Sequence, residues 1–197
     1  MTQAAEKLDL DHLRQWIGRS TEASDIVTAQ LVKGLRATLF QDIGEPKTGD
    51  AAPWTTHWCL AQPVFPMSQL GPDGHPTRGG FLPPVPLPRR MWAGSQFEFR
   101  APLRVGDRAE RSSTIADVTV KEGRSGRLVF VKVRHEIRCN GAAEAALVEF
   151  HDIVYREAKQ PGDVEPPPVA AATGAAWQRE IVPDDVLLFR YSALTFN

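Results

Sequence analysis

Cysteine is scarce in this sequence of 197 residues, which holds only Cys59 and Cys139. Two thiols so far apart are too few for a zinc cluster or a disulfide framework, so we expect ordinary buried thiols in a reducing cytoplasm. Long apolar runs are also missing, because nowhere do about 18 apolar residues follow one another, and residues 1–10 carry acidic side chains instead of an apolar run. Neither a membrane span nor a signal peptide is expected.

An excess of charge of either sign is missing as well. The 23 Lys and Arg residues stand against 24 Asp and Glu residues, a net charge of -1, which leaves no sequence-wide field to attract nucleic acid or an anionic membrane. Nor do aromatic residues interleave with the cations, as they do on single-stranded nucleic-acid surfaces. The sequence also has no nucleophile elbow, phosphate loop or metal-ligand signature. We therefore expect no nucleic-acid partner, no metal and no cofactor.

What is present first is the period of amphipathic helices in the N-terminal part. Apolar residues that share one helical face predict a short helix near 9–18. A second apolar set recurs every four residues and predicts a helix over 26–40; it consists of Val27, Leu31, Leu35 and Leu39. The candidate N-cap residues of this second helix are Ser24, Asp25 and Thr28.

The next part of the chain is rich in apolar residues and then in Pro and Gly. A buried helical segment is expected over 54–67, although Pro63 and Pro66 interrupt it. Between positions 71 and 90, ten of twenty residues are Pro or Gly. A structureless loop of that length inside a domain is usually functional or a lid.

Beyond this loop the apolar residues alternate with polar ones, as in β-strands. The alternating segments lie at 96–100, 114–120, 129–138 and 146–154. Hairpin loops are expected at Glu122–Gly126 and at Asn140–Gly141, because Asn-Gly suits the positive φ angles of a tight turn. The pattern predicts an α+β fold, in which a meander of antiparallel strands has helices covering one face of the sheet.

The C-terminal part differs in composition. Residues 159–176 are rich in Pro and Ala without a hydrophobic period, which is typical of a linker between a domain at 1–158 and a new segment at 177–197. The 21 residues of this segment cannot bury a core of their own. Either they lie on the first domain or the natural chain runs further.

Histidines are the first candidates for acid–base chemistry near neutral pH. His57 is the one expected to face a pocket, but no carboxylate lies between positions 54 and 70, so a core role is favoured. His135 and His151 fall on neighbouring strands beside acidic residues that point to the opposite face, so we expect structural roles on a solvated sheet face. Lys121, Arg124 and Arg127 cluster at a hairpin tip and are candidates to bind phosphate groups.

Five segments resemble a known family. They are GGFLPPVPLPRRMWAG at 79–94, PLRVGD at 102–107, KEGRSG at 121–126, HDIVYR at 151–156 and LFRYSALTFN at 188–197. Together they resemble the type 2 hydroxyacyl-thioester dehydratases and mesaconyl-CoA hydratases with MaoC-like hot-dog domains. The resemblance covers nearly the whole chain from Trp16 onward.

The resemblance implies a hot-dog fold, a curved antiparallel sheet wrapped around a central helix, here with extra N-terminal helices. It implies that 1–158 is a non-catalytic N-terminal hot-dog domain and that 177–197 starts a second one. The second domain would carry the catalytic Asn and a His five residues on. Asn197 matches the Asn, and the His position lies past the last residue, so this chain alone is expected to be inactive.

The implied activity is the addition or removal of water across the 2,3 double bond of an enoyl- or mesaconyl-type CoA thioester, which is a substrate and not a cofactor. The residues expected to contact the acyl-CoA are His57, Trp58, Phe65, Arg89, Arg90, Trp92, Lys121, Arg124 and Arg127. The expected partner is a second hot-dog domain or a second copy of the chain, since the sheet has an exposed edge. Two alternatives are a hot-dog thioesterase, disfavoured by the missing carboxylate over 54–70, and a non-catalytic acyl-CoA-binding or assembly module.

Overall fold

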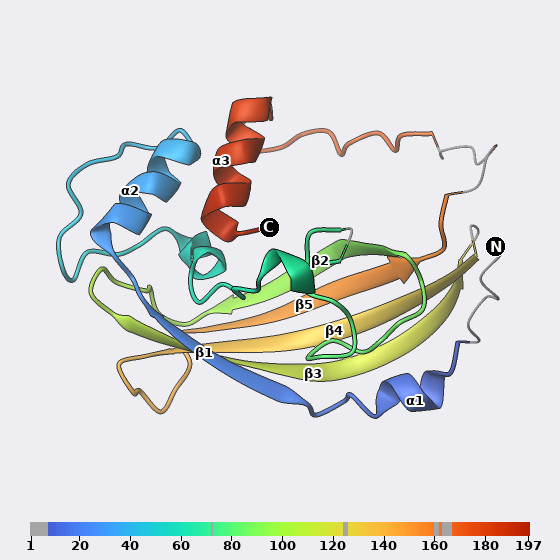
Figure 1. Ribbon diagram of the computed structural model, residues 1–197. Helices are drawn as coiled ribbons and strands as arrows, with labels where there is room; N and C mark the ends of the chain where they lie inside the picture. Colours follow the sequence, from blue (N-terminus) through green and yellow to red (C-terminus); the bar gives the residue numbers. More distant parts are fainter. Residues whose placement is uncertain (1–7, 72, 124–125, 160–161, 163–166) are drawn as a thin grey trace.

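The computed structural model describes residues 8–71, 73–123, 126–159, 162 and 167–197. Its described part contains one antiparallel sheet in the strand order β1-β3-β4-β5-β2. The strands are β1 (Ser20–Ile26), β2 (Arg89–Phe99), β3 (Arg108–Gly123), β4 (Gly126–Cys139) and β5 (Leu147–Arg156). The helices are α1 (Leu10–Arg14), α2 (Ala29–Thr38), α3 (Asp185–Thr195) and the short 3-10 helices η1 (Trp54–Cys59) and η2 (Met67–Gln69). The sheet curves beneath α2 and α3 (Figure 1), which confirms the α+β hot-dog plan.

The first strand is an element that the sequence analysis missed. Residues 20–26 form β1, which pairs antiparallel with the start of β3, and helix α2 begins only at Ala29. The hydroxyl of Thr28, one of the three expected caps, accepts a hydrogen bond from the backbone N–H of Leu31 at 3.1 Å. Because β1 is an edge strand with mostly exposed polar side chains, it has no alternation of apolar residues to reveal it.

The helical cover of the sheet is shorter than predicted between positions 54 and 67. Only residues 54–59 are helical there, as the 3-10 helix η1, and an irregular stretch that contains Pro63 and Pro66 follows before η2. Proline lacks the N–H that a helix interior needs and disfavours helical geometry in the residue before it. The two prolines therefore end the helix that the apolar composition favoured.

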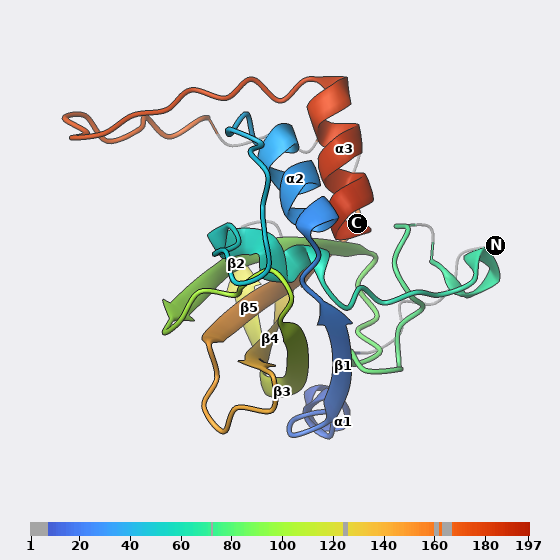
Figure 2. The ribbon, with the colours of Figure 1, turned by 90° about the vertical axis from the view of Figure 1, so that its left-hand side faces the viewer.

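The C-terminal helix packs against the preceding part of the chain. Helix α3 runs beside α2 (Figure 2), and a Cβ added at Gly34 of α2 would lie 3.4 Å from Cδ2 of Leu194. The side-chain amide of Gln62, just after η1, donates a hydrogen bond to the carbonyl of Leu194. The end of α3 thus rests over the concave side of the sheet next to η1.

Two apolar clusters fill the concave side. One contains Leu13 of α1, Val85 and Leu87 of the Pro- and Gly-rich loop, and strand residues of β3, β4 and β5. The other packs Val27 and Val32 against strand residues at the opposite end of β4. Each side chain of this size buried in full contributes about 1.5–3 kcal/mol. The clusters therefore hold α1, α2 and the loop on the sheet from two separate ends.

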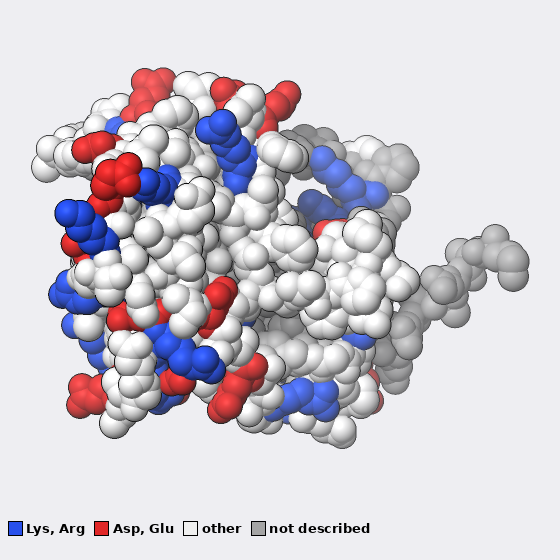
Figure 3. Space-filling view, turned by 60° about the vertical axis from the view of Figure 1, so that its left-hand side comes forward, with Lys and Arg blue, Asp and Glu red and all other residues white. Residues whose placement is uncertain are grey.

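The opposite face of the sheet carries many charged side chains, beside the buried Val148 and Val154 of β5. On β4, Glu136 pairs with Arg134 and with Arg138, and on β2 Glu98 pairs with Arg100 at 3.0 Å. Acidic and basic side chains are interspersed on the side of the molecule that Figure 3 displays, without a large patch of either sign. Among the described helices, none combines the length and the hydropathy needed to cross a bilayer.

The described residues of the loop at 71–88 are fastened to the sheet through one side chain. The guanidinium of Arg78 donates hydrogen bonds to the carbonyls of Val85, Leu87 and Pro88, and it lies 5.2 Å from the ring centroid of Tyr155. The loop is therefore a packed cover of the first apolar cluster.

The substitution Arg78→Met tests this role. It leaves three carbonyls without their charged donor, and hydrogen bonds to charged groups contribute about 1.5–3 kcal/mol each. We expect a clearly lowered midpoint of urea unfolding and faster protease cleavage within 71–88. Arg89→Met, which among the described residues removes only a side-chain contact to the sulfur of Met91, is the matched control. Equal midpoints for the two variants would contradict the role given to Arg78.

Candidate functional site

A polar band crosses the concave face of the sheet between the two apolar clusters. Along β4 this face is apolar at Val129, Val131 and Val133, polar at His135, and apolar again at Ile137. A polar residue inside a buried apolar series is informative because burying it is unfavourable unless it is hydrogen-bonded. This band is the candidate functional site.

The register of the strands brings the members of the band together. His135 of β4 lies opposite Ser113 of β3 on one side and opposite Glu149 of β5 on the other. Ser95 of β2 lies opposite His151 of β5. Directly opposite residues share a face, and positions 149 and 151 share it because they are two apart. All five side chains therefore point to the concave side.

Glu149 is the centre of the band. Its side chain is 2 % exposed, and it accepts hydrogen bonds from Ser95 Oγ at 2.6 Å, His57 Nε2 and Trp58 Nε1 at 3.2 Å, and His151 Nδ1 at 3.3 Å. Burial by itself raises the pKa of this carboxyl group, but the hydrogen bonds from His151, His57 and Ser95 lower it by more, so that the net pKa lies well below the ordinary glutamate value. Glu149 is thus a buried carboxylate at neutral pH.

His57 acquires a carboxylate partner from far along the chain. The expectation that it lacks one was wrong, because Glu149 reaches it from β5 although no acid lies in 54–70. Its other ring nitrogen, Nδ1, lies 3.2 Å from the carbonyl of Trp54, one turn earlier in η1. Both ring nitrogens therefore face oxygen acceptors, the carboxylate of Glu149 and the carbonyl of Trp54.

His135 and His151 occupy the cavity side of the band, not the solvated face that the sequence analysis expected. Burial is the main cause that lowers the pKa of His135 to about 4, so this ring is neutral at pH 7. Its Nδ1 lies 2.7 Å from Ser113 Oγ. His151 turns Nδ1 to Glu149, which orients its ring and leaves Nε2 for a ligand, the arrangement of a carboxylate–histidine pair in acid–base catalysis.

Aromatic rings form one side of the site. Phe97 and Phe99 of β2 stack with their centroids 5.5 Å apart, and the edge of the His57 ring meets Phe97 at 5.8 Å. Trp58 lies 5.7 Å from Phe97, and Trp54 lies 4.8 Å from Phe99. These rings exclude water from the His57–Glu149 pair and offer an apolar surface to a ligand.

A cavity of about 170 Å³ opens onto the polar band. It is lined by His57, Trp58, Gln62, Pro63, Arg111, His135, Ile137, Glu149, His151 and Thr195. Thr195 is the last residue of α3, two positions before Asn197. Asn197, the predicted catalytic residue, therefore lies two positions after the end of a helix that contributes to this cavity.

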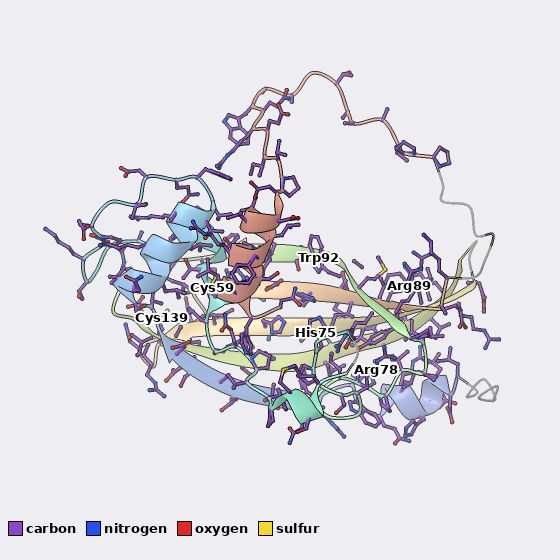
Figure 4. The ribbon with its side chains drawn as sticks, turned by 45° about the horizontal axis from the view of Figure 1, so that its top comes forward. Cys59, His75, Arg78, Arg89, Trp92 and Cys139 are labelled. Carbon is purple, nitrogen blue, oxygen red and sulfur yellow. The ribbon has the colours of Figure 1, made fainter. Side chains whose placement is uncertain are left out.

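The other predicted contact residues of the loop and of β2 divide into two groups. Trp92 and Arg89 lie along β2 (Figure 4), and Trp92 donates a hydrogen bond at 3.2 Å to Ser95, which in turn donates to Glu149. Arg90 is nearly buried and pairs with Asp73 at 2.9 Å, away from the cavity. Phe65 is 41 % exposed and does not line the cavity. Of these four residues, Trp92 lies at the edge of the band, whereas Arg89, Arg90 and Phe65 do not line the cavity.

The basic hairpin lies at the far end of the sheet. Lys121 is eight positions beyond Ser113 on β3, a separation of about 27 Å at roughly 3.4 Å per residue. Arg127 pairs with Glu122 at 3.3 Å, and Arg124 lies outside the described residues. The hairpin and the polar band are therefore separate features.

Two further features lie apart from the polar band. A hollow of about 510 Å³ runs along the edge formed by β1 and β3, where Arg108 pairs with Glu110 at 3.3 Å and also binds the hydroxyl of Ser24. Cys59 and Cys139 (Figure 4) have pKa values raised to about 11, mainly by burial, so both stay protonated thiols at neutral pH. Neither feature combines buried titratable groups with a cavity, as the polar band does.

Three side chains of the band have the composition of a metal site. His135, Glu149 and His151 each offer one ligand atom, and these atoms lie within 4.8 Å of one another. The set fits a divalent cation poorly, because Glu149 already accepts four hydrogen bonds and the guanidinium of Arg111 lines the same cavity. The donor set favours a hydrogen-bonded network over a metal centre.

The sequence contained a signal for this band that its analysis did not use. Continuing the period of Val129, Val131 and Val133 by one step reaches His135, the first break in the series. On β5 the alternation was followed through the even-numbered residues, whereas Glu149 and His151 point to the concave face. Glu149 was missed for this reason. Ser95 on β2 and Ser113 and Arg111 on β3 were missed as well.

The fold and the polar band define a hot-dog domain with a buried polar site. Solved structures share this fold: a MaoC-like dehydratase from Phytophthora capsici matches with a TM-score of 0.56 and 12% identity, covering 95% of this chain and 64% of that one. The ChsH1–ChsH2 complex from Mycobacterium tuberculosis matches with a TM-score of 0.54 and 12% identity, covering 81% of this chain and 97% of that one. At these identities the likeness shows the fold alone.

The sequence comparisons are more specific. The family model of hydroxyacyl-thioester dehydratase type 2 matches residues 55–197. Mesaconyl-C(4)-CoA hydratase from Chloroflexus aurantiacus is 44% identical over 191 residues, which cover 92% of this chain and 64% of that protein. The chain belongs to the hydroxyacyl-thioester dehydratase type 2 family, and it spans just under two thirds of the length of this relative.

The substitution Glu149→Gln tests the centre of the band. Breaking a buried ion pair by removing one partner destabilises a protein by about 3–5 kcal/mol, so the variant should be less stable by this order at pH 7. Because the folded protein lowers the pKa of Glu149, its carboxylate stabilises the fold above the ordinary glutamate pKa of 4.5, and this contribution is lost as the pH falls below it.

The measurement is urea unfolding between pH 7 and pH 3. The stability difference between the wild type and Glu149→Gln should shrink below pH 4.5. Glu98→Gln, the same change at an exposed surface pair of β2, is the control and should unfold like the wild type at pH 7. A difference from the wild type that stays constant over the whole range would show that Glu149 is not a buried carboxylate.

Proposed function

We propose that this chain is the N-terminal part of a hydratase or dehydratase that adds or removes water across the 2,3 double bond of an enoyl- or mesaconyl-type CoA thioester. The family supports the reaction class, and the identity of 44% with a mesaconyl-C(4)-CoA hydratase supports the substrate class. Because the chain spans 64% of that relative, the activity of the whole protein is part of the proposal.

One observation carries the proposal to specific residues. The cavity of the polar band is lined both by groups of the first domain and by Thr195 at the end of α3, two positions before the predicted catalytic Asn197. A substrate that reached Asn197 would therefore meet His151 and His57 as well. The first domain then forms one wall of a shared active site.

The roles of the residues follow from the chemistry of hydration. A base removes a proton from water as its oxygen adds to the β-carbon, and an acid delivers a proton to the α-carbon. Asn197 and a His five residues further on would position and activate this water. Within this chain, Glu149 orients His151, whose Nε2 can hold or release a proton at the cavity, and Trp58 with Phe97 shields the acyl group from solvent.

The proposed contacts to the pantetheine arm and the phosphate groups of CoA rest on fewer observations. Trp92 is 62 % exposed at the edge of the band and can pack against the pantetheine arm. Lys121 and Arg127 remain the proposed phosphate contacts, although Arg127 is already paired with Glu122 and Lys121 lies 4.9 Å from the centroid of the Phe130 ring. No cofactor is part of the proposal, and we propose that the protein is cytoplasmic.

The proposed partner is a second hot-dog domain or a second copy of the chain. Helix α3 exposes Val186, Leu188 and Phe189, which are 60 %, 54 % and 75 % accessible. Exposed apolar groups of this kind on one helix mark a surface that another element covers.

A thioesterase is the second candidate, and one observation favours it. That enzyme needs a carboxylate to activate water against the thioester carbonyl, and Glu149 supplies one beside η1 after all. Its oxygens are already occupied by four donors, which leaves little capacity to accept a proton from water. The hydro-lyase proposal is therefore the stronger one.

The test compares this chain with a version extended through the second domain. The loss of enoyl-thioester absorbance is followed with crotonyl-CoA and mesaconyl-CoA, and free CoA thiol is measured in parallel. We expect hydration by the extended protein, none by the chain ending at Asn197, and none by the extended Asn197→Ala variant. Equal hydration by both lengths would refute the placement of the base, and release of thiol without hydration would favour the thioesterase.

A further inference from the structure

The cavity of the polar band contains a cation that forms no ion pair within the described part of the chain. Arg111 of β3 is partly buried, and two of its nitrogens donate to the carbonyls of Leu60 and Ala61 at 3.3 and 2.6 Å. It forms no ion pair with any acidic side chain in the described parts of the chain, and burial lowers its pKa more than the field of Glu149 raises it. Buried cations are normally paired, so one without a counter-ion beside a cavity indicates an anionic ligand.

The carboxylate of Glu149 does not serve as that counter-ion. Its oxygens accept hydrogen bonds from four other side chains, those of Ser95, His57, Trp58 and His151, and it forms no ion pair with Arg111. Arg111 is held instead by two backbone carbonyls, which do not neutralise its charge. The guanidinium therefore has no direct counter-ion among the described residues that line the cavity.

The size and the donors of the cavity restrict the anion. A volume of about 170 Å³ is well below the roughly 300–1,000 Å³ of a pocket for a drug-sized ligand, so it takes the end of a short acyl group and not the CoA moiety. Arg111 has five N–H donors in a planar fork, of which the two backbone carbonyls use only part. The open donors match the two oxygens of a carboxylate.

We propose that Arg111 binds a free carboxylate carried by the acyl group, so that the protein selects acyl thioesters with a second carboxylate over neutral ones of the same shape. This inference rests on the proposed function. It assigns the polar cavity to the end of the acyl group remote from the sulfur and gives Arg111 the role of a specificity residue.

The experiment uses the extended protein and two substrates of matched shape. Mesaconyl-C4-CoA carries a methyl group and a carboxylate on its β-carbon, and 3-methylcrotonyl-CoA carries two methyl groups there. The Arg111→Gln variant should lower kcat/KM for mesaconyl-C4-CoA about 10- to 100-fold, the loss expected when a charge-assisted hydrogen bond is removed. The value for 3-methylcrotonyl-CoA should change less than threefold.

Two further variants keep the test independent of folding. Arg111→Lys retains the charge and should recover part of the preference for mesaconyl-C4-CoA. Arg108→Gln removes an exposed arginine from the same strand and should leave the ratio of the two kcat/KM values unchanged. Because the ratio is taken within one protein sample, partial unfolding lowers both values equally and does not alter it.

The outcomes separate the two proposals. If neither substrate is hydrated by the extended wild-type protein, the proposed function is wrong and the inference is wrong with it. If the wild type hydrates its substrates but Arg111→Gln keeps the same ratio, only the inference is overturned. Should 1 mM Zn²⁺ change the ratio in the wild type but not in a His135→Ala variant, the cavity binds a metal, and the role of Arg111 is overturned in favour of that site.

Discussion

The buried carboxylate of Glu149 is the constraint on which this site depends. A charge that is 2 % exposed is tolerated only when donors and a positive charge replace the water it has lost. The donors come from separate elements, since Ser95 lies on β2, His151 on β5, and His57 with Trp58 on η1. The carboxylate of Glu149 thereby fixes the short 3-10 helix η1 to the middle of the sheet. The six residues of η1 alone would not be stable in this position.

Apolar packing and the polar network divide the concave face between them. The cluster around Val131 and the cluster around Ile137 each bury enough surface to hold their own cover of helix or loop. The band between them contributes less to stability, because every polar group there must be matched by a partner. A protein that needed only a stable core would have an apolar residue at position 135. The polar band lowers the stability of the core, and we attribute its presence to function.

Much of the fold could be predicted from the sequence, and the reason is periodicity. Helix α2 and strands β3, β4 and β5 follow from the spacing of apolar residues, and Thr28 was among the expected caps. Strand β1 could not be found, since both of its faces are polar. The site was harder still, because the contact between His57 and Glu149 joins residues 92 positions apart and depends on strand register, which no local pattern encodes.

The same network explains how one arginine can determine the charge of the cavity. The oxygens of Glu149 accept hydrogen bonds from four other side chains, and Glu149 forms no ion pair with Arg111. Arg111 keeps its place through backbone carbonyls, which hold the guanidinium without neutralising it. In an environment of low dielectric constant such a charge strongly favours an anion over a neutral group, since a neutral acyl end leaves its N–H donors unpaired. Discrimination would therefore arise mainly from the penalty on the wrong ligand.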